Sequence, residues 1–238
     1  MVNIDTVYQR VLAFANKEQR GYITPQEFNL FANQAQLEIF EQYFYDLNQF
    51  ARVPGNEYVY ADVDDILEEK IQIFESEDLE GDINNYTKTA AGIPILPNYI
   101  YRVERVEWEA FDCEILKTKD FKDTITAGGL VAPSKSRPTV NVRNNLIRVS
   151  LGSTNFVPPT AIYYLRKPRK AQWGFVVINE RALHDPNTQK TTNFELHAAE
   201  ETELVYKILK FAGVSMAKLD IMRVGQVQEQ SQHQQEKQ

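Results

Sequence analysis

Apolar residues recur at helical spacing over the first fifty residues of the chain. The first run predicts a helix over residues 5–20, and the second predicts a long helix over residues 25–51. The long helix carries a second apolar stripe, made of Leu30, Leu37, Phe40 and Phe44. A helix that is apolar over more than one face needs more cover than one neighbouring helix gives. We therefore expect a further surface to cover this helix.

A capping box marks the start of the long helix. Thr24 stands at the N-cap, Pro25 at the first helical position and Glu27 at the third, so Thr24 and Glu27 are each expected to bind the other's backbone N–H. The same stretch, residues 16–27, has the spacing of the later half of a calcium loop. However, Arg20 stands where an oxygen ligand belongs, and the capping box explains the other residues without a metal. We predict that no metal binds here.

An acidic segment follows the long helix. The pattern predicts a short strand over residues 58–61 and then a helix over residues 62–74. Between residues 62 and 82, Lys70 is the one basic residue among ten acidic ones: Asp62, Asp64, Asp65, Glu68, Glu69, Glu75, Glu77, Asp78, Glu80 and Asp82. Such a run predicts a strongly negative surface. Its first part, Asp62, Asp64, Asp65, Glu68 and Glu69, is one half of a candidate interface.

The middle third of the chain changes to a strand pattern. β-Branched and aromatic residues alternate between closely spaced turn signals. The candidate strands are residues 99–111, 113–118, 139–142, 146–151, 160–165 and 173–178. Asn144 and Asn145 are expected to form a tight hairpin turn, because asparagine tolerates positive φ. These features predict a small antiparallel sheet, sandwich-like or barrel-like.

Helical spacing returns over residues 198–212, and a polar, glutamine-rich tail ends the chain. The predicted fold class is therefore α+β, a helical bundle formed by the N- and C-terminal segments with a central antiparallel β insertion. The expected division is an N-terminal helical region over residues 1–90, a β region over 91–190, C-terminal helices over 191–224 and a flexible tail over 225–238.

Charge and composition narrow the class of protein. The chain has 26 lysine and arginine residues against 33 aspartate and glutamate residues, a net charge of −7, which disfavours a dedicated nucleic-acid binder. With Cys113 as the only cysteine, neither an internal disulfide nor a cysteine-based zinc site is possible within one chain. No apolar run is long enough for a membrane helix. We expect no membrane partner.

No combination of residues in the sequence predicts catalysis. His184, His197 and His233 are the only histidines, and none has the spacing of a helical metal-binding pair. Nucleophile elbows, phosphate-binding glycine loops and dinucleotide fingerprints are absent from the sequence. We predict that the protein is not an enzyme and that it uses neither a metal nor a cofactor.

One short basic segment, residues 166–170, stands out from the acidic background. Arg166, Lys167, Arg169 and Lys170 are followed by Trp173. Such an aromatic and basic loop suits nucleic acid, a plain strand connection, or contact with the acidic surface of a neighbouring subunit. We favour the subunit contact, with these five residues as its basic half. The alternative function is an intracellular nucleic-acid-binding or regulatory module that uses this segment.

Three pieces of the chain resemble virion structural proteins of crAss-like and related podoviruses. They are IPILPNYIYRVERVEWEAFDCEILK (93–117), AIYYLRKPRKAQWGF (161–175) and NFELHAAEETELVYKILKFAGV (193–214). The opening ITPQEFNLFANQAQLEIFEQYF (23–44) resembles the N-terminal helical region of the same proteins. This family includes the neck and tail ring subunits, or head-to-tail adaptors, stacked beneath the portal.

The resemblance implies a place and a set of partners in the virion. It implies a ring, commonly of twelve copies, that joins head to tail and forms part of the DNA conduit. The expected partners are further copies of the chain, the portal and other neck or tail proteins, while the genome passes through the lumen without specific binding. Such a subunit is made in the host cytoplasm. It also implies a helical bundle from both chain ends around a β insertion, which agrees with the reading of the residues.

Overall fold

Both ends of the chain build one compact unit, and its middle builds another. The computed structural model describes residues 1–17, 23–50, 57–152, 156–179, 181–185 and 190–215. The helical unit comprises Met1–Ile73 and Pro168–Gln238, and the β unit comprises Phe74–Lys167. The α+β class is confirmed. The borders of the units fall after Ile73 and Lys167, whereas the sequence pattern placed the borders of the β region at residues 91 and 190.

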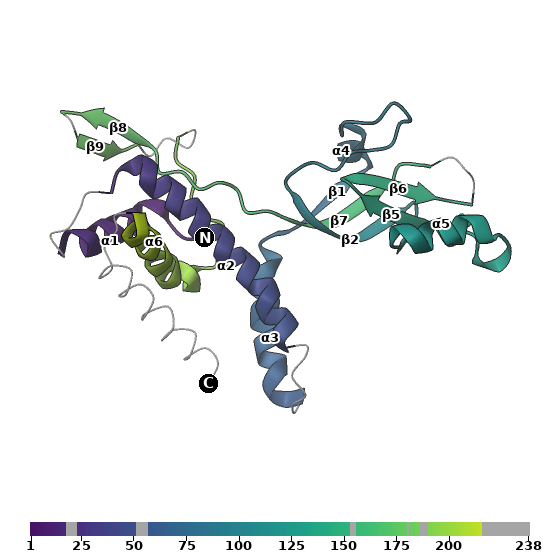
Figure 1. Cartoon of the computed structure of the whole chain (residues 1–238), viewed down its shortest axis with the longest axis horizontal. Helices are drawn as coiled ribbons and strands as arrows, with labels where there is room; N and C mark the ends of the chain where they lie inside the picture. The colour runs from purple at the N-terminus through teal and green to yellow at the C-terminus, as the bar shows by residue number, and fades with distance from the viewer. Residues whose placement is uncertain (18–22, 51–56, 153–155, 180, 186–189, 216–238) are drawn as a thin grey trace. The chain divides into compact units, whose positions relative to one another are not determined.

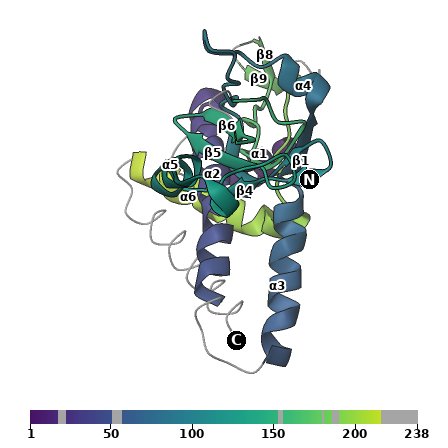
Figure 2. The same ribbon diagram turned by 90° about the vertical axis from the view of Figure 1, so that its right-hand side faces the viewer.

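The helical unit packs its first two helices against a C-terminal helix, and a further helix against the second. Its elements are α1 (Ile4–Lys17), α2 (Pro25–Phe50), α3 (Glu57–Gln72), the 3-10 turn η2 (Ala198–Glu200) and α6 (Glu201–Ser215). α6 contacts both α1 and α2, and α3 lies beside α2 (Figures 1 and 2). The apolar spacing noted above becomes the packed face, with Val7, Phe28, Ile39, Leu204 and Ile208 all buried. The two N-terminal helices α1 and α2 and the helix α6 therefore share one core.

The capping box at the start of α2 is confirmed. The backbone N–H of Thr24 donates to Glu27 Oε2 at 3.0 Å, and that of Glu27 donates to Thr24 Oγ1 at 3.3 Å. The Thr24 hydroxyl also donates to Glu27 Oε2 at 2.8 Å, and this bond lowers the pKa of the Glu27 carboxyl. Two otherwise unpaired donors of the helix start are satisfied by side chains. The middle of the proposed calcium loop lies outside the described residues.

A two-stranded hairpin also belongs to the helical unit. Its strands are β8 (Phe175–Ile178) and β9 (Arg181–His184), paired antiparallel. Two isolated antiparallel bridges, Val2 to Phe194 and Gln172 to Thr192, connect segments next to this hairpin. The sequence placed residues 173–178 in the β region, but this strand pairs with β9 and not with the sheets of the β unit.

The β unit holds two small sheets. The first has the order β1-β7-β2-β3, with β1 (Glu75–Leu79), β7 (Ala161–Arg166), β2 (Ile100–Trp108) and β3 (Phe111–Asp112), all antiparallel. The second has the order β4-β5-β6, with β4 (Glu114–Ile115), β5 (Thr139–Arg143) and β6 (Leu146–Ser150). In the second sheet β4 pairs parallel to β5, so this sheet is mixed. Neither sheet closes into a barrel in the described part of the chain.

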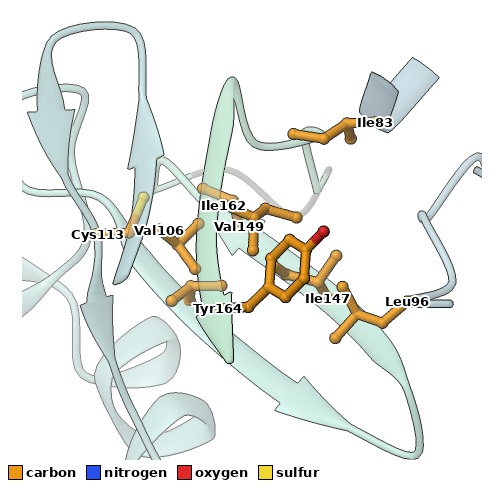
Figure 3. Close-up of a cluster of buried hydrophobic side chains, with 9 residues drawn as sticks. Ile83, Leu96, Val106, Cys113, Ile147, Val149, Ile162 and Tyr164 are labelled. Carbon is orange, nitrogen blue, oxygen red and sulfur yellow. The ribbon is translucent and has the colours of Figure 1, made fainter. Parts of the chain in front are cut away.

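One cluster of buried side chains joins the two sheets. Its members are Ile83, Leu96, Val106, Cys113, Val140, Ile147, Val149, Ile162 and Tyr164. Figure 3 shows the Tyr164 ring among the aliphatic side chains, with its hydroxyl pointing away from its strand. Val106 and Ile162 come from the first sheet and Ile147 and Val149 from the second, so a sandwich-like core is present and the barrel-like alternative is not.

Several sequence predictions of elements in and before the β unit were wrong. Residues 58–61 are not a strand, because α3 begins at Glu57. The predicted strand over residues 113–118 is reduced to β4, since the helix α5 (Thr118–Ala127) takes its end. Three short pieces without a clear apolar pattern were not predicted: β1, α4 (Glu80–Asn84) and the 3-10 turn η1 (Gly129–Val131). β1 is acidic because it lies at a sheet edge, where one side faces water.

The turn between β5 and β6 was predicted correctly. Asn144 and Asn145 have φ of 52° and 59°, and the flanking residues Arg143 and Leu146 pair with each other. Positive φ at both central residues is what a two-residue hairpin of right-handed twist needs.

We expect Gly152→Ala to destabilise the β unit. Gly152 has φ of 89°, and a Cβ there would lie 2.3 Å from the carbonyl oxygen of Pro133. Strain and the backbone clash together should lower the free energy of unfolding by about 1–3 kcal/mol. Urea unfolding followed by circular dichroism measures this change. The control is Gly81→Ala, where a Cβ meets no atom within 4 Å; equal stability of the two variants would contradict the prediction.

Candidate functional site

The acidic half of the candidate interface lies on α3. The side chains of Asp65, Glu68 and Glu69 are exposed. The side chains of Asp62 and Asp64 lie outside the described residues. Lys70 does not neutralise this face, because its Nζ lies 2.6 Å from Glu200 Oε1, which is buried. These carboxylates are therefore available to a partner, and their role at an interface stays a prediction.

The basic segment is divided between the two units. Arg166 ends β7 and Lys167 follows it in the β unit, while Arg169 and Lys170 open the second part of the helical unit. Lys167, Arg169 and Lys170 are exposed. Arg169 has a partner within the chain, since its Nε lies 3.6 Å from Glu195 Oε1. The exposed positive charge of this segment remains available for a neighbouring acidic surface.

Trp173 does not belong to this interface. Its side chain is only 1% exposed, and its ring lies 4.1 Å from that of Tyr8, centroid to centroid. Its Nε1–H donates to Asp5 Oδ1 at 2.9 Å. Trp173 is therefore a core residue of the helical unit, and the sequence prediction that placed it in a contact surface was wrong. It is also unable to stack on a base, which weakens the nucleic-acid alternative.

A row of amide side chains on α2 fixes the basic segment, and the sequence reading missed it. Asn33 Nδ2 donates to the carbonyl oxygen of Ala171 at 2.8 Å, and Gln36 Nε2 donates to that of Arg169 at 2.7 Å. Asn29 both accepts from the N–H of Trp173 and donates to its carbonyl oxygen. The spacing of these amides at positions 29, 33 and 36, along one side of the helix, was the available signal. The segment is thus held by its backbone, and its basic side chains stay outside.

The second apolar stripe of α2 is only partly covered. Phe40 is buried against Phe44, with ring centroids 5.0 Å apart. Leu30, by contrast, is 70% exposed, and Leu37 and Tyr45 are exposed on the same side of the helix. Two leucines seven residues apart on an exposed helix face are suited to contact another chain.

The β8–β9 hairpin exposes apolar side chains as well. Val176, Val177, Ile178 and Leu183 are all exposed, with Val177 at 62%. Among the described strands, β8 and β9 pair only with each other. A two-stranded ribbon of this kind offers unpaired backbone groups together with apolar side chains, which is a common basis for association between chains.

A carboxylate bound by three phenols lies in the β unit. The hydroxyls of Tyr86 and Tyr99 donate to Asp78 Oδ2, the latter at 3.0 Å, and the hydroxyl of Tyr164 donates to Oδ1 at 3.0 Å. Asp78 comes from β1, Tyr164 from β7, and the other two tyrosines from the chain between α4 and β2. Burial raises the pKa of Tyr86, Tyr99 and Tyr164, and Asp78 raises it further, so all three remain protonated donors.

A second cluster of charges is buried in the helical unit. Glu203 and Lys207 on α6 are both buried, with Lys207 Nζ 3.3 Å from Glu203 Oε1. Lys207 Nζ also donates to Gln42 Oε1 on α2 at 3.5 Å. Burial, with Glu200 nearby, raises the pKa of Glu203 to about 7, although Lys207 opposes the shift. The cluster ties α6 to α2 and makes this contact sensitive to pH.

Cys113 and His197 have structural contacts in the described part of the chain. No group of three or more metal-binding side chains is found among them. Burial raises the pKa of the Cys113 thiol to about 12, so it is a packing residue and a poor nucleophile. His197 Nδ1 accepts from the N–H of Ala199 at 3.3 Å and caps η2. Across the described ranges, no helix is both long and apolar enough to span a membrane.

No protein-family model matches the chain, and no curated protein matches its sequence.

Proposed function

We propose that the chain is a structural subunit of a tailed-phage particle that forms a ring at the junction of portal, neck and tail. The proposal starts from the resemblance of residues 93–117, 161–175 and 193–214 to virion proteins of crAss-like and related podoviruses. In this role the subunit connects head to tail and forms part of the DNA conduit. Its neighbours would be copies of itself, the portal and other neck or tail proteins.

The observation that carries this proposal is the apolar surface left exposed on the helical unit. Leu30 and Leu37 on α2 and Val177 and Ile178 on β8 remain in contact with water in the isolated chain. Full burial of an apolar side chain of this size contributes about 1.5–3 kcal/mol of favourable free energy. A chain with two such surfaces in one unit is suited to repeat contacts with its own copies.

The acidic face of α3 fits the conduit part of the proposal. Asp65, Glu68 and Glu69 are exposed and their charge repels phosphate. A lumen lined by them would let the genome slide without specific binding. Locating these residues on the outer surface of an assembled ring would remove this part of the proposal and leave the ring itself standing.

We expect the double substitution Leu30→Glu, Leu37→Glu to prevent self-association. Two charges would replace two exposed leucines on one face of α2, and the lost apolar contact should weaken assembly at least about tenfold. Light scattering after size-exclusion chromatography measures the mass of the assembled species. Circular dichroism should remain that of the native chain, because neither side chain belongs to the core.

The matched control keeps the apolar surface. Leu30→Met with Leu37→Met alters shape but not polarity, so it should assemble like the native chain. Unchanged assembly of the glutamate variant would show that α2 is not the contact surface. In that case the same pair of measurements on Val177→Glu would test the β8–β9 hairpin.

A further inference from the structure

A pocket opens in the β unit beside the edge strand β1. Its volume is about 530 Å³, which is ample for a ligand the size of an amino-acid side chain. Asp78, Asp82, Tyr86 and Tyr99 form its polar wall, and Ile95 and Leu96 contribute an apolar wall. The lining contains two carboxylates and no basic residue. All of these residues belong to one unit of the chain.

The hydrogen bonds to Asp78 leave an acceptor, but no phenol donor, for a ligand. The three phenols that reach Asp78 use their only O–H groups on its carboxylate. A carboxylate has about four acceptor positions, so one position on Oδ1 remains. Within the described residues no basic side chain forms an ion pair with Asp78 or Asp82. The negative charge of the pocket is therefore not balanced from within.

We propose that this pocket binds the cationic head group of an arginine or lysine side chain, supplied by the basic segment of a second copy of the chain. The source of the cation rests on the proposed function, because it requires contact between copies. Binding of a cation by the pocket does not depend on the proposed function.

The two walls match the two halves of such a side chain. Ile95 and Leu96 suit the aliphatic stem, while the carboxylates of Asp78 and Asp82 suit the charged head. The rings of Tyr86 and Tyr99 add aromatic faces, over which a guanidinium or ammonium group is attracted. Arginine fits best, because its planar group can stack on a ring and donate to a carboxylate at the same time.

Other ligand classes fit less well. A phosphate or nucleotide would be repelled by the two carboxylates, because the pocket lining has no basic side chain to attract it. A metal ion would have to compete with three protonated phenols for Asp78, and no metal-binding group of three acids, histidines or cysteines is found in the described residues. A neutral apolar ligand would take the carboxylates out of water without compensation.

Charge complementarity points to the basic segment as the source. Lys167 and Lys170 are exposed, in an otherwise acidic protein with a net charge of −7. The backbone around Lys170 is fixed by hydrogen bonds from Asn33 and Gln36, so the segment is presented at little cost in entropy. Opposite charges arranged in this way set the register of subunits in an assembly.

The cation-binding property is tested with agmatine, which carries the arginine head group on an aliphatic stem. Agmatine added to the full chain should shift the NMR signals of Tyr86, Tyr99 and Leu96, and neutral butylurea should not. Asp78→Asn should weaken agmatine binding more than about tenfold, since hydrogen bonds to charged groups are the stronger ones. Asp82→Asn, at an exposed position, should weaken it about two- to fivefold.

Asp123→Asn is the matched control for charge. It removes an exposed carboxylate of the same unit outside the pocket lining, so agmatine binding should be unchanged. Should Asp78→Asn not fold, Asp82→Asn carries the test alone. Equal binding by the Asp82 and Asp123 variants, equal binding of butylurea, or no shift with agmatine would overturn the proposal.

A peptide of residues 165–172, LRKPRKAQ, tests the source. It should displace agmatine from the native chain, and the same peptide with its four basic residues changed to glutamine should not. If agmatine bound but the peptide did not displace it, the proposal that a second copy supplies the cation would be wrong. If Asp78→Asn assembled with unchanged mass and affinity, the inference would fail while the ring proposal survived. If the native chain bound agmatine but never assembled, the ring proposal and the second-copy source would both fail, and only the cation-binding property of the pocket would survive.

Discussion

Replacing Trp173 with alanine is expected to destabilise the helical unit by about 3–5 kcal/mol. The indole is fully buried, packs against Tyr8, and lies 5.9 Å from the Phe175 ring and 5.7 Å from that of His184. Its removal leaves a cavity where α1, α2 and the β8–β9 hairpin meet, and Asp5 loses its indole donor. Urea unfolding of the intact chain, followed by far-ultraviolet circular dichroism, measures the decrease in the free energy of unfolding.

Trp173→Phe separates packing from hydrogen bonding. It keeps most of the ring volume but removes the Nε1–H that donates to Asp5, so its cost should be clearly smaller than that of the alanine variant. Arg169→Ala, in the same segment but exposed, should change stability little. A Trp173→Ala variant as stable as the native chain would return this residue to the surface role that the sequence suggested.

Stability of the helical unit is expected to fall as pH rises from about 5.5 to 8. In the folded chain the pKa of Glu203 is about 7, above its ordinary value of 4.5, because the carboxyl is buried and lies near Glu200. The folded state therefore holds a proton that the unfolded state has released. This contribution is complete below about pH 4.5 and is lost as pH rises through about 7. Its full size is on the order of 3 kcal/mol, of which about 2 kcal/mol is lost between pH 5.5 and 8.

Glu203→Gln isolates this effect from the other titrating groups. Glutamine stays neutral, so the decrease in the free energy of unfolding between pH 5.5 and 8 should become smaller than in the native chain. All other ionisable groups are the same in both proteins, so the difference between the two pH profiles reports on Glu203. Glu69→Gln, which neutralises an exposed carboxylate of α3, should keep the native pH dependence. If both variants had the native pH dependence, Glu203 would not be the group responsible.

Local patterns in the sequence were sufficient for the helices α1, α2 and α6 and for the tight turn. The capping box of Thr24 and Glu27 and the Asn144–Asn145 turn depend on neighbours within three residues, so the sequence contains their determinants. The uncovered side of α2 was expected as well, although Phe40 is buried and only Leu30 and Leu37 of that stripe are exposed.

The errors concern residues whose neighbours are far away in the chain. Trp173 follows a basic run and looked like part of a surface, but its partners Asp5 and Asn29 are 168 and 144 residues away. β1 was read as plain acidic surface, because its partner β7 begins at Ala161.

Asp78 was missed for the same reason. Its bond with Tyr164 spans 86 residues, and no spacing along the sequence brings the three tyrosines to one aspartate. The alternation of exposed and half-buried positions along β1 places Asp78 on the inner side of the strand, but this pattern is visible only after the strand has been recognised.

The central claim is that the exposed apolar surface of the helical unit is covered by further copies of the same chain. Native mass spectrometry of the purified full chain over a range of concentrations tests it most directly. We expect one closed species whose mass is a whole multiple of 27.5 kDa, with twelve copies as the number implied by the resemblance. A monomer at every concentration, with Leu30 and Leu37 still open to solvent, would contradict the account.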